Sequence, residues 1–168
     1  LPITAVKTAK LLIKKDAKSF LRRLPVIAIE DVLLHPGYDK LVGLASASSD
    51  KDFVLQPEDK EFCLQTVEQL ARCLYRDTEF LDYQQGRKEP DLPSGMHGLN
   101  EQEQELARAL KRRAGMGGMK DDMEMLRLTS RIWIRRFQNR EFRISDLQKY
   151  FPKPEMDHSQ LPERDASD

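Results

Sequence analysis

Cysteine is scarce in this sequence: only Cys63 and Cys73 occur among its 168 residues. Both fall in one expected helix, where ten residues separate them by about 15 Å, too far for a disulfide. A chain held together by disulfides is therefore excluded. We expect two buried thiols in a reducing, intracellular compartment: the nucleus or the cytoplasm, with an organelle as an open alternative.

Long apolar runs are missing as well, and uninterrupted apolar stretches stay far below the ~18 residues that a membrane-spanning helix needs. The alternation of apolar and polar residues that marks a half-buried strand is also absent over any convincing length. What remains is a chain with 39% hydrophobic and 33% charged residues, a composition typical of a helical protein with a large polar surface. We therefore expect an all-α fold and no membrane partner.

Apolar residues instead recur every three to four positions in several segments, which is the spacing of an amphipathic helix. These segments predict a compact bundle of about six to seven helices that forms one domain, residues 1–151. Pro25 lies between the first two segments and either opens the second helix or kinks a continuous one. The expected helices cover residues 1–24, 26–34, 38–49, 57–74, 100–114, 122–137 and 145–151.

Two segments lack this spacing. Residues 76–98 are acidic and then contain several glycines and prolines, so we expect a long, partly mobile loop. From Pro152 onward the chain is polar and interrupted by prolines, and it cannot bury enough apolar surface to become ordered. Residues 152–168 are therefore expected to form a disordered tail.

The most apolar stretch, residues 20–36, contains two arginines and two adjacent carboxylates. Burying a carboxylate is costly unless it has a partner, and neighbouring residues of a helix point about 100° apart. The two carboxylates therefore need two separate partners. We expect structural, buried ion pairs that involve Arg22, Arg23, Glu30 and Asp31, with Arg112 and Arg113 as alternative partners.

An enzymatic interpretation of the same stretch is weaker. Asp31 and His35 lie four residues apart on one helix face, which is half of a metal site or half of an acid–base pair. The other two histidines, His97 and His158, fall in the expected loop and tail, so no ligand cluster emerges. We expect His35 to cap a helix or to form hydrogen bonds, and we expect no catalytic residue, metal site or cofactor.

The charges of the chain balance to a net charge of zero, but they are unevenly distributed. Basic residues gather in two zones, 7–23 and 108–143, whereas acidic residues gather in residues 76–105 and in the tail. This distribution predicts either one basic face on the surface or internal pairing between the acidic and basic zones.

The second basic zone carries the candidate nucleic-acid contacts. Arginines at four positions between 127 and 136 recur at helical spacing and predict one basic stripe. Residues 127–151 as a whole resemble a helix-turn-helix. The glycines before Lys120 would let backbone N–H groups reach a phosphate, although the spacing of a P-loop is missing. The candidate contacts are Arg112, Arg113, Lys120, Arg127, Arg131, Arg135, Arg136, Arg140, Arg143, Gln148 and Lys149.

One run of residues resembles a known family. The run Arg22-Arg23-Leu24…Ile27-Ala28…Glu30-Asp31-Val32…Leu34…Pro36 is similar to the helical carboxy-terminal region of the RarA (MgsA) clamp-loader-like ATPases. There, a similar arginine pair and a similar Glu-Asp open an all-helical oligomerisation domain. The ATPase module is missing from this sequence, and nothing after Asp77 follows the pattern. The resemblance implies a helical assembly domain or a DNA-transaction domain without catalysis.

These observations together favour a non-enzymatic, helical module that binds nucleic acid, with DNA as the favoured partner, in DNA replication, repair or maintenance. The alternative is a protein–protein adaptor or an oligomerisation domain of a larger assembly. An affinity for nucleic acid that falls steeply with added salt would favour the first interpretation. A salt-insensitive complex or self-association would favour the second.

Overall fold

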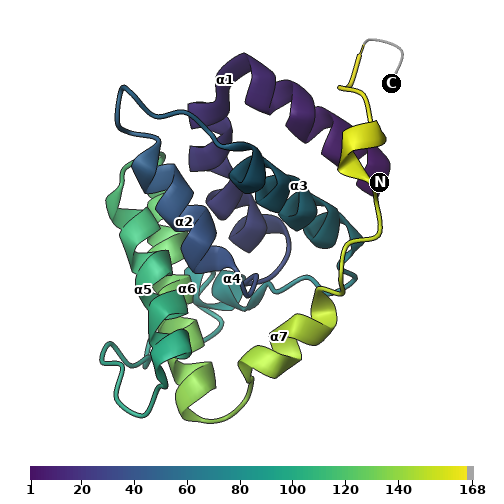
Figure 1. Cartoon of the computed structure of the whole chain (residues 1–168). Coiled ribbons are helices and arrows are strands. Elements are labelled where there is room, and N and C mark those ends of the chain that lie inside the picture. Colours follow the sequence, from purple (N-terminus) through teal and green to yellow (C-terminus); the bar gives the residue numbers. More distant parts are fainter. Residues whose placement is uncertain (166–168) are drawn as a thin grey trace.

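A computed structural model of the chain describes residues 1–165, and within this range it consists of helices without any strand. The predicted all-α bundle is therefore confirmed (Figure 1). Residues 166–168, which belong to the predicted tail, lie outside the described residues. The helices are α1 (Pro2–Asp31), α2 (Tyr38–Ala47), α3 (Pro57–Arg72), α4 (Glu79–Gln84), α5 (Glu101–Gly115), α6 (Lys120–Gln138), α7 (Ile144–Tyr150) and the short 3-10 helix η1 (His158–Gln160).

Helix α1 is broken at Asp16 and not at Pro25. Asp16 has the extended backbone angles φ −159° and ψ 87°, and its carboxylate accepts hydrogen bonds from the backbone N–H (3.1 Å) and the hydroxyl (2.7 Å) of Ser19. This is a side-chain cap on the turn that follows. Asp16 thus separates a first arm, residues 2–15, from a second arm, residues 17–31, and Figure 1 shows the bend between them.

Pro25 lies inside the second arm, where it has no N–H to contribute and its ring disturbs the preceding turn. Two neighbouring carbonyls are instead bonded by side chains from other helices. The carbonyl of Arg22 accepts a hydrogen bond from Arg113 Nε at 3.0 Å, and the carbonyl of Pro25 accepts one from the Tyr38 hydroxyl at 2.9 Å. The proline therefore helps to fix the positions of α2 and α5 against α1.

The helices pack in a connected order. Helix α1 contacts α3 on one side and α2 on the other, α2 packs on α5, and α5 lies beside α6 (Figure 1). Fully buried side chains such as Trp133, Tyr38 and Phe137 fill the core between these helices. Among residues 1–165, no helix combines the length and the apolar character needed to cross a membrane.

The start of α5 is fixed by hydrogen bonds between residues that are close in the sequence. Asn100 Oδ1 accepts the backbone N–H of Glu103 at 2.8 Å, and Glu103 Oε1 accepts the backbone N–H of Asn100 at 2.9 Å. This is a capping box. Helix α6 begins at Lys120 without a side-chain cap, two residues before the start expected from the sequence.

Two segments that lack helical periodicity are more ordered than their composition predicts. Helix α4 lies inside the predicted 76–98 loop, and side chains of α5 and α6 bond carbonyls at Leu92, Pro93, Ser94 and Gly95. Residues 152–165 are not a free tail, because they lie against α1 and α3 and include η1. In both cases the ordering contacts come from distant parts of the chain, so local composition does not reveal them.

Candidate functional site

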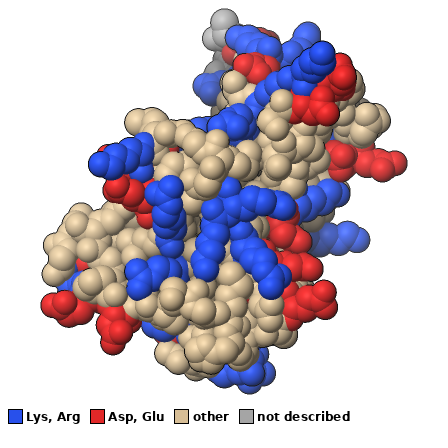
Figure 2. All heavy atoms as spheres, turned by 90° about the vertical axis from the view of Figure 1, so that its left-hand side faces the viewer, with Lys and Arg blue, Asp and Glu red and all other residues tan. Residues whose placement is uncertain are grey.

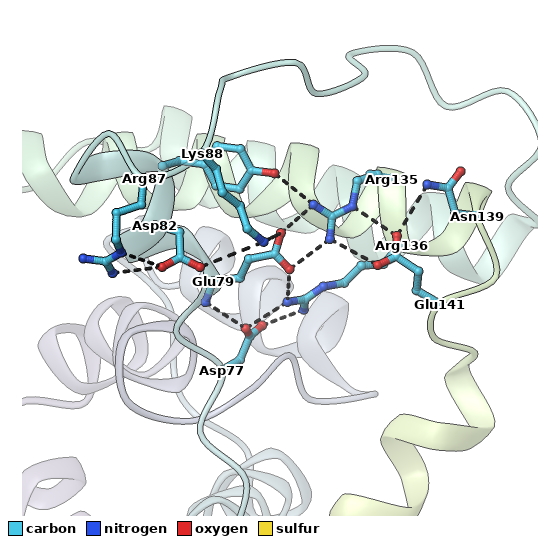
Figure 3. Close-up of polar contacts among 10 residues, drawn as sticks. Asp77, Glu79, Asp82, Arg87, Lys88, Arg135, Arg136, Asn139 and Glu141 are labelled. Carbon is cyan, nitrogen blue, oxygen red and sulfur yellow. Dashed lines mark hydrogen bonds and ion pairs between the residues drawn. The ribbon is translucent and has the colours of Figure 1, made fainter.

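The most strongly bonded polar cluster joins α6 to α4 (Figure 3). Arg136 is only 4% exposed. Its guanidinium forms a bidentate salt bridge with Asp77, with Nη1 at 2.7 Å from Oδ2 and Nη2 at 2.9 Å from Oδ1. Nη2 also donates to Glu79 Oε1 at 2.9 Å, and the guanidinium carbon lies 4.6 Å from the centre of the Trp133 ring. Arg136 is therefore a structural residue.

Arg135 completes this cluster from the adjacent position. It donates to Glu79 Oε1 at 2.9 Å, to Glu141 Oε2 at 3.1 Å and to the Tyr83 hydroxyl at 2.9 Å. Burial alone would raise the pKa of Glu79, but the hydrogen bonds from both arginines outweigh it and lower the pKa to about 2. The hydrogen bond to Glu79 likewise raises the pKa of Arg135. Glu79 is thus ionised at neutral pH, and its partners all belong to the chain itself.

The predicted basic stripe of α6 is therefore largely occupied within the protein. Besides the two arginines above, Arg131 reaches the carbonyls of Leu92 (2.6 Å) and Pro93 (3.4 Å). The buried Arg113 bonds the carbonyls of Arg22 and Gly117, each at 3.0 Å. We correct the prediction for these four arginines: their donors bond carboxylates and carbonyls of the chain itself, so they do not form a free phosphate-binding surface.

The other predicted nucleic-acid contacts are exposed, but they lie in two separate places. Helix α6 has 19 residues and is about 28 Å long. One group lies on the last turn of α5 and the first half of α6, and the other lies on the connection after α6 and on α7. The predicted helix-turn-helix stripe therefore does not form one continuous surface. The first group is Arg112, Lys120 and Arg127, and the second is Arg140, Arg143, Gln148 and Lys149.

Arg112 and Arg127 belong to a larger basic surface that the sequence did not single out. Arg108, Lys111 and Arg112 are exposed and share one side of α5. Arg127 lies one turn before Arg131 on α6, and Lys111 (3.3 Å, to Ser94) reaches the same 92–94 segment as Arg131. We call these four residues, Arg108, Lys111, Arg112 and Arg127, the α5 basic patch.

Figure 2 shows lysine and arginine side chains crowded in the middle of the face that lies on the left of Figure 1, where α2 and α5 are. Arg108 and Arg112 line a hollow there together with Asp39 and Glu105. Positive charge is therefore concentrated on this face although the whole chain is neutral. A basic patch with accessible donors is suited to binding a polyanion.

The predicted buried ion pairs of α1 are also corrected. Arg23 is 3.7 Å from Glu30, but both side chains are nearly half exposed, and Arg23 pairs more closely with Asp122 at 2.8 Å. Asp31 is exposed, and Arg22 bonds the carbonyls of Met116 and Gly117. The physical reason is helical geometry: Glu30 and Asp31 share the outer face of the second arm with the exposed Ile27.

His35 has a structural environment. It is 6% exposed; its Nδ1 accepts the backbone N–H of Gly37 at 2.9 Å, so its Nε2 donates to Gln69 Oε1 at 2.8 Å. Burial lowers the pKa of the imidazole.

Cys63 is buried and Cys73 half-buried, and both are free thiols. In the part of the chain that the structure covers, no group of three potential metal ligands occurs.

An apolar groove lies between the two arms of α1 and α3. Its floor consists of small residues of the first arm, including Ala5, Thr8 and Ala9. The walls include Leu12, Phe20, Leu24, Ile27, Val67 and Leu70. Leu12 and Ile27 are 46% and 37% exposed. At the bend of α1 the groove is bordered by Lys15, Asp16 and Arg23.

Comparison of the chain with protein-family models, with curated proteins and with solved structures gives no match. None of these comparisons bears on the resemblance of residues 22–36 to the RarA (MgsA) ATPases, which stays a prediction.

Proposed function

We propose that this protein is a non-enzymatic module that binds nucleic acid through the α5 basic patch. The observation that carries the proposal is that Arg108, Lys111, Arg112 and Arg127 are all exposed on the neighbouring helices α5 and α6. Figure 2 shows lysine and arginine side chains gathered on the face where α5 lies. Arg112 and Arg127 have no hydrogen-bonded or ion-pair partner within residues 1–165, unlike the arginines of the Arg135–Arg136 cluster. Their guanidinium groups are therefore available for bidentate contacts to phosphates.

The favoured partner is DNA, in replication, repair or maintenance inside the nucleus or the cytoplasm. The preference for DNA rests on the resemblance of residues 22–36 to a DNA-transaction family. Contacts to phosphates position a protein without reading bases, so the patch predicts binding with little sequence preference.

Binding through four phosphate contacts has a defined salt dependence. We expect the logarithm of the association constant for duplex DNA to fall with the logarithm of salt concentration with a slope of about −3 to −4. Fluorescence anisotropy of a labelled duplex across a salt series measures this slope. A slope near zero, or no binding at low salt, would overturn the proposal.

A second candidate function, a protein-binding adaptor, is favoured by the apolar groove of α1 and α3. We propose that its partner is an amphipathic helix with an apolar stripe and acidic residues at the end that lies over Lys15. The small floor residues allow the close approach that helix packing requires, and the exposed Lys15 complements acidic side chains.

The test uses a synthetic amphipathic helix with a leucine stripe and terminal glutamates, labelled for anisotropy. We expect Leu12→Glu and Ile27→Glu to weaken its binding by at least about tenfold, because each places a charge in the apolar contact. Val54→Glu is the matched control, since Val54 is 70% exposed and is not a groove residue.

The same peptide with lysines in place of glutamates should bind more weakly, and tighter binding of the lysine peptide would contradict the proposed partner. Sedimentation of the protein alone tests another occupant. Self-association that Leu12→Glu abolishes would show that a second copy of this chain fills the groove.

A further inference from the structure

The C-terminal segment, residues 152–165, is held against α1 and α3 by polar contacts along its length. Glu68 Oε2 accepts the backbone N–H of Glu155 at 2.8 Å, and Lys10 Nζ donates to the carbonyl of His158 at 2.7 Å. Further along, the backbone N–H of Arg164 donates to the carbonyl of Lys7 at 3.0 Å. The segment therefore spans both helices.

His158 is the most buried contact of this segment, with 2% of the residue exposed. Its Nδ1 lies 2.7 Å from Glu61 Oε1, and its Nε2 lies 2.7 Å from Glu68 Oε1. Ionised carboxylates only accept hydrogen bonds, whereas a neutral imidazole has one donor and one acceptor nitrogen. The observed bridge between two carboxylates therefore requires the imidazolium, in which both nitrogens donate.

We propose that His158 is a pH-sensitive latch: its imidazolium bridges Glu61 and Glu68 and holds residues 152–165 closed, and loss of its proton loosens the segment. This inference is independent of the proposed nucleic-acid and protein binding. The neutral ring can still donate from Nε2 to Glu68, but the lone pair of Nδ1 then faces the carboxylate of Glu61. Because the Glu61 side chain is 46% exposed, it can turn into water.

Charged groups of both α3 and α1 surround this bridge. On α3, Arg72 Nε donates to the fully buried Glu68 at 3.0 Å and balances its charge. On α1, Lys10 bonds carbonyls of the segment, and Lys14 lies 3.4 Å from Glu163. Lysine and arginine stay charged well above neutral pH. The closed state is therefore stabilised while His158 is protonated, and this stabilisation is lost as the pH rises.

Acidic solution should also open the segment, because Glu68 then becomes protonated. Burial alone would raise the pKa of Glu68, but hydrogen bonds from Glu155, His158 and Arg72 outweigh it and lower this pKa. The carboxylate therefore persists into more acidic solution than an ordinary glutamate does, and its protonation removes the acceptor. Closure should follow a bell-shaped dependence on pH.

Opening would change the surface of α1 and α3. Met156 and Leu161 pack against the core, and Arg164 lines the apolar groove and donates to the Thr8 hydroxyl at 3.2 Å. Release of residues 152–165 would expose additional apolar surface beside the groove. The latch is therefore a device that controls how much of this surface is accessible.

Hydrogen exchange of the Glu155 and Met156 amides, both of which donate to Glu68, tests the latch in the full chain. After correction for intrinsic exchange rates, we expect their protection to fall by at least about tenfold between about pH 6 and pH 8.5. Amides in the middle of α5 should show no such fall. Equal protection of Glu155 and Met156 at both pH values would overturn the proposal.

Glu61→Gln provides the sharpest comparison, because it preserves the shape of the bridge. The Gln amide can donate to Nδ1 of a neutral imidazole while Nε2 still donates to Glu68. We expect this variant to stay closed with nearly constant protection across the same pH range. In His158→Gln we expect low protection at both pH values. A Glu61→Gln variant that keeps the wild-type fall in protection would contradict the role of His158.

Discussion

Replacing Arg136 with alanine should lower the free energy of unfolding by about 3 to 5 kcal/mol. The substitution would leave Asp77, which is 8% exposed, without its bidentate partner. It would also remove the guanidinium that lies over Trp133. Urea denaturation followed by the helical circular-dichroism signal measures the change.

Arg127→Ala is the matched control on the same helix, because Arg127 is exposed. We expect its effect on the unfolding free energy to stay within about 0.5 kcal/mol. The double variant Arg136→Ala with Asp77→Ala should cost less than the sum of the two single changes, since neither residue then leaves a buried charge behind. Equal, small effects of Arg136→Ala and Arg127→Ala would contradict the structural role of Arg136.

The arginines of α6 show where prediction from the sequence ends. Helical spacing correctly placed them on one helix, but it does not reveal whether a face of that helix meets solvent or carboxylates. The partners of Arg136 and Arg135, Asp77 and Glu79, lie 59 and 56 residues away along the chain. The sequence left internal pairing of acidic and basic zones open as an alternative, and for these two arginines that alternative holds.

Sequence patterns predicted the helices better than the contacts between distant residues, because a helix depends mainly on its neighbouring residues. Apolar periodicity indicated the main helices, and the helix expected over residues 100–114 agrees with α5, which Asn100 caps. The latch escaped prediction because no local feature distinguishes His158 in a polar, proline-containing segment. Only Glu61 and Glu68 offered a signal, since a separation of seven residues places both on one side of α3.

Replacing Glu68 with alanine should lower the free energy of unfolding by about 3 kcal/mol. The fully buried carboxylate accepts hydrogen bonds from His158, Arg72 and the backbone of Glu155. Its removal would leave the buried imidazole and the backbone donors without an acceptor. The same urea denaturation measures the loss, and a glutamate-specific protease should cleave after the exposed Glu155 faster than in the wild type.

Glu61→Ala is the control for this change, because Glu61 binds the other nitrogen of the same ring but is nearly half exposed. We expect a cost of less than about 1 kcal/mol. If Glu61→Ala destabilises the protein as much as Glu68→Ala does, then the burial of Glu68 does not explain its role in holding residues 152–165.

The most direct test of DNA binding through the α5 basic patch compares two variants, each with two charge reversals. Their affinities for the same labelled DNA duplex are measured at one salt concentration. Arg112→Glu with Arg127→Glu disrupts the α5 basic patch, whereas Arg143→Glu with Lys149→Glu changes the same amount of charge at α7. We expect the first pair to lose at least about tenfold in affinity and the second pair to stay within about threefold of the wild type. Greater loss from the α7 pair, or equal loss from both, would contradict DNA binding through the α5 basic patch.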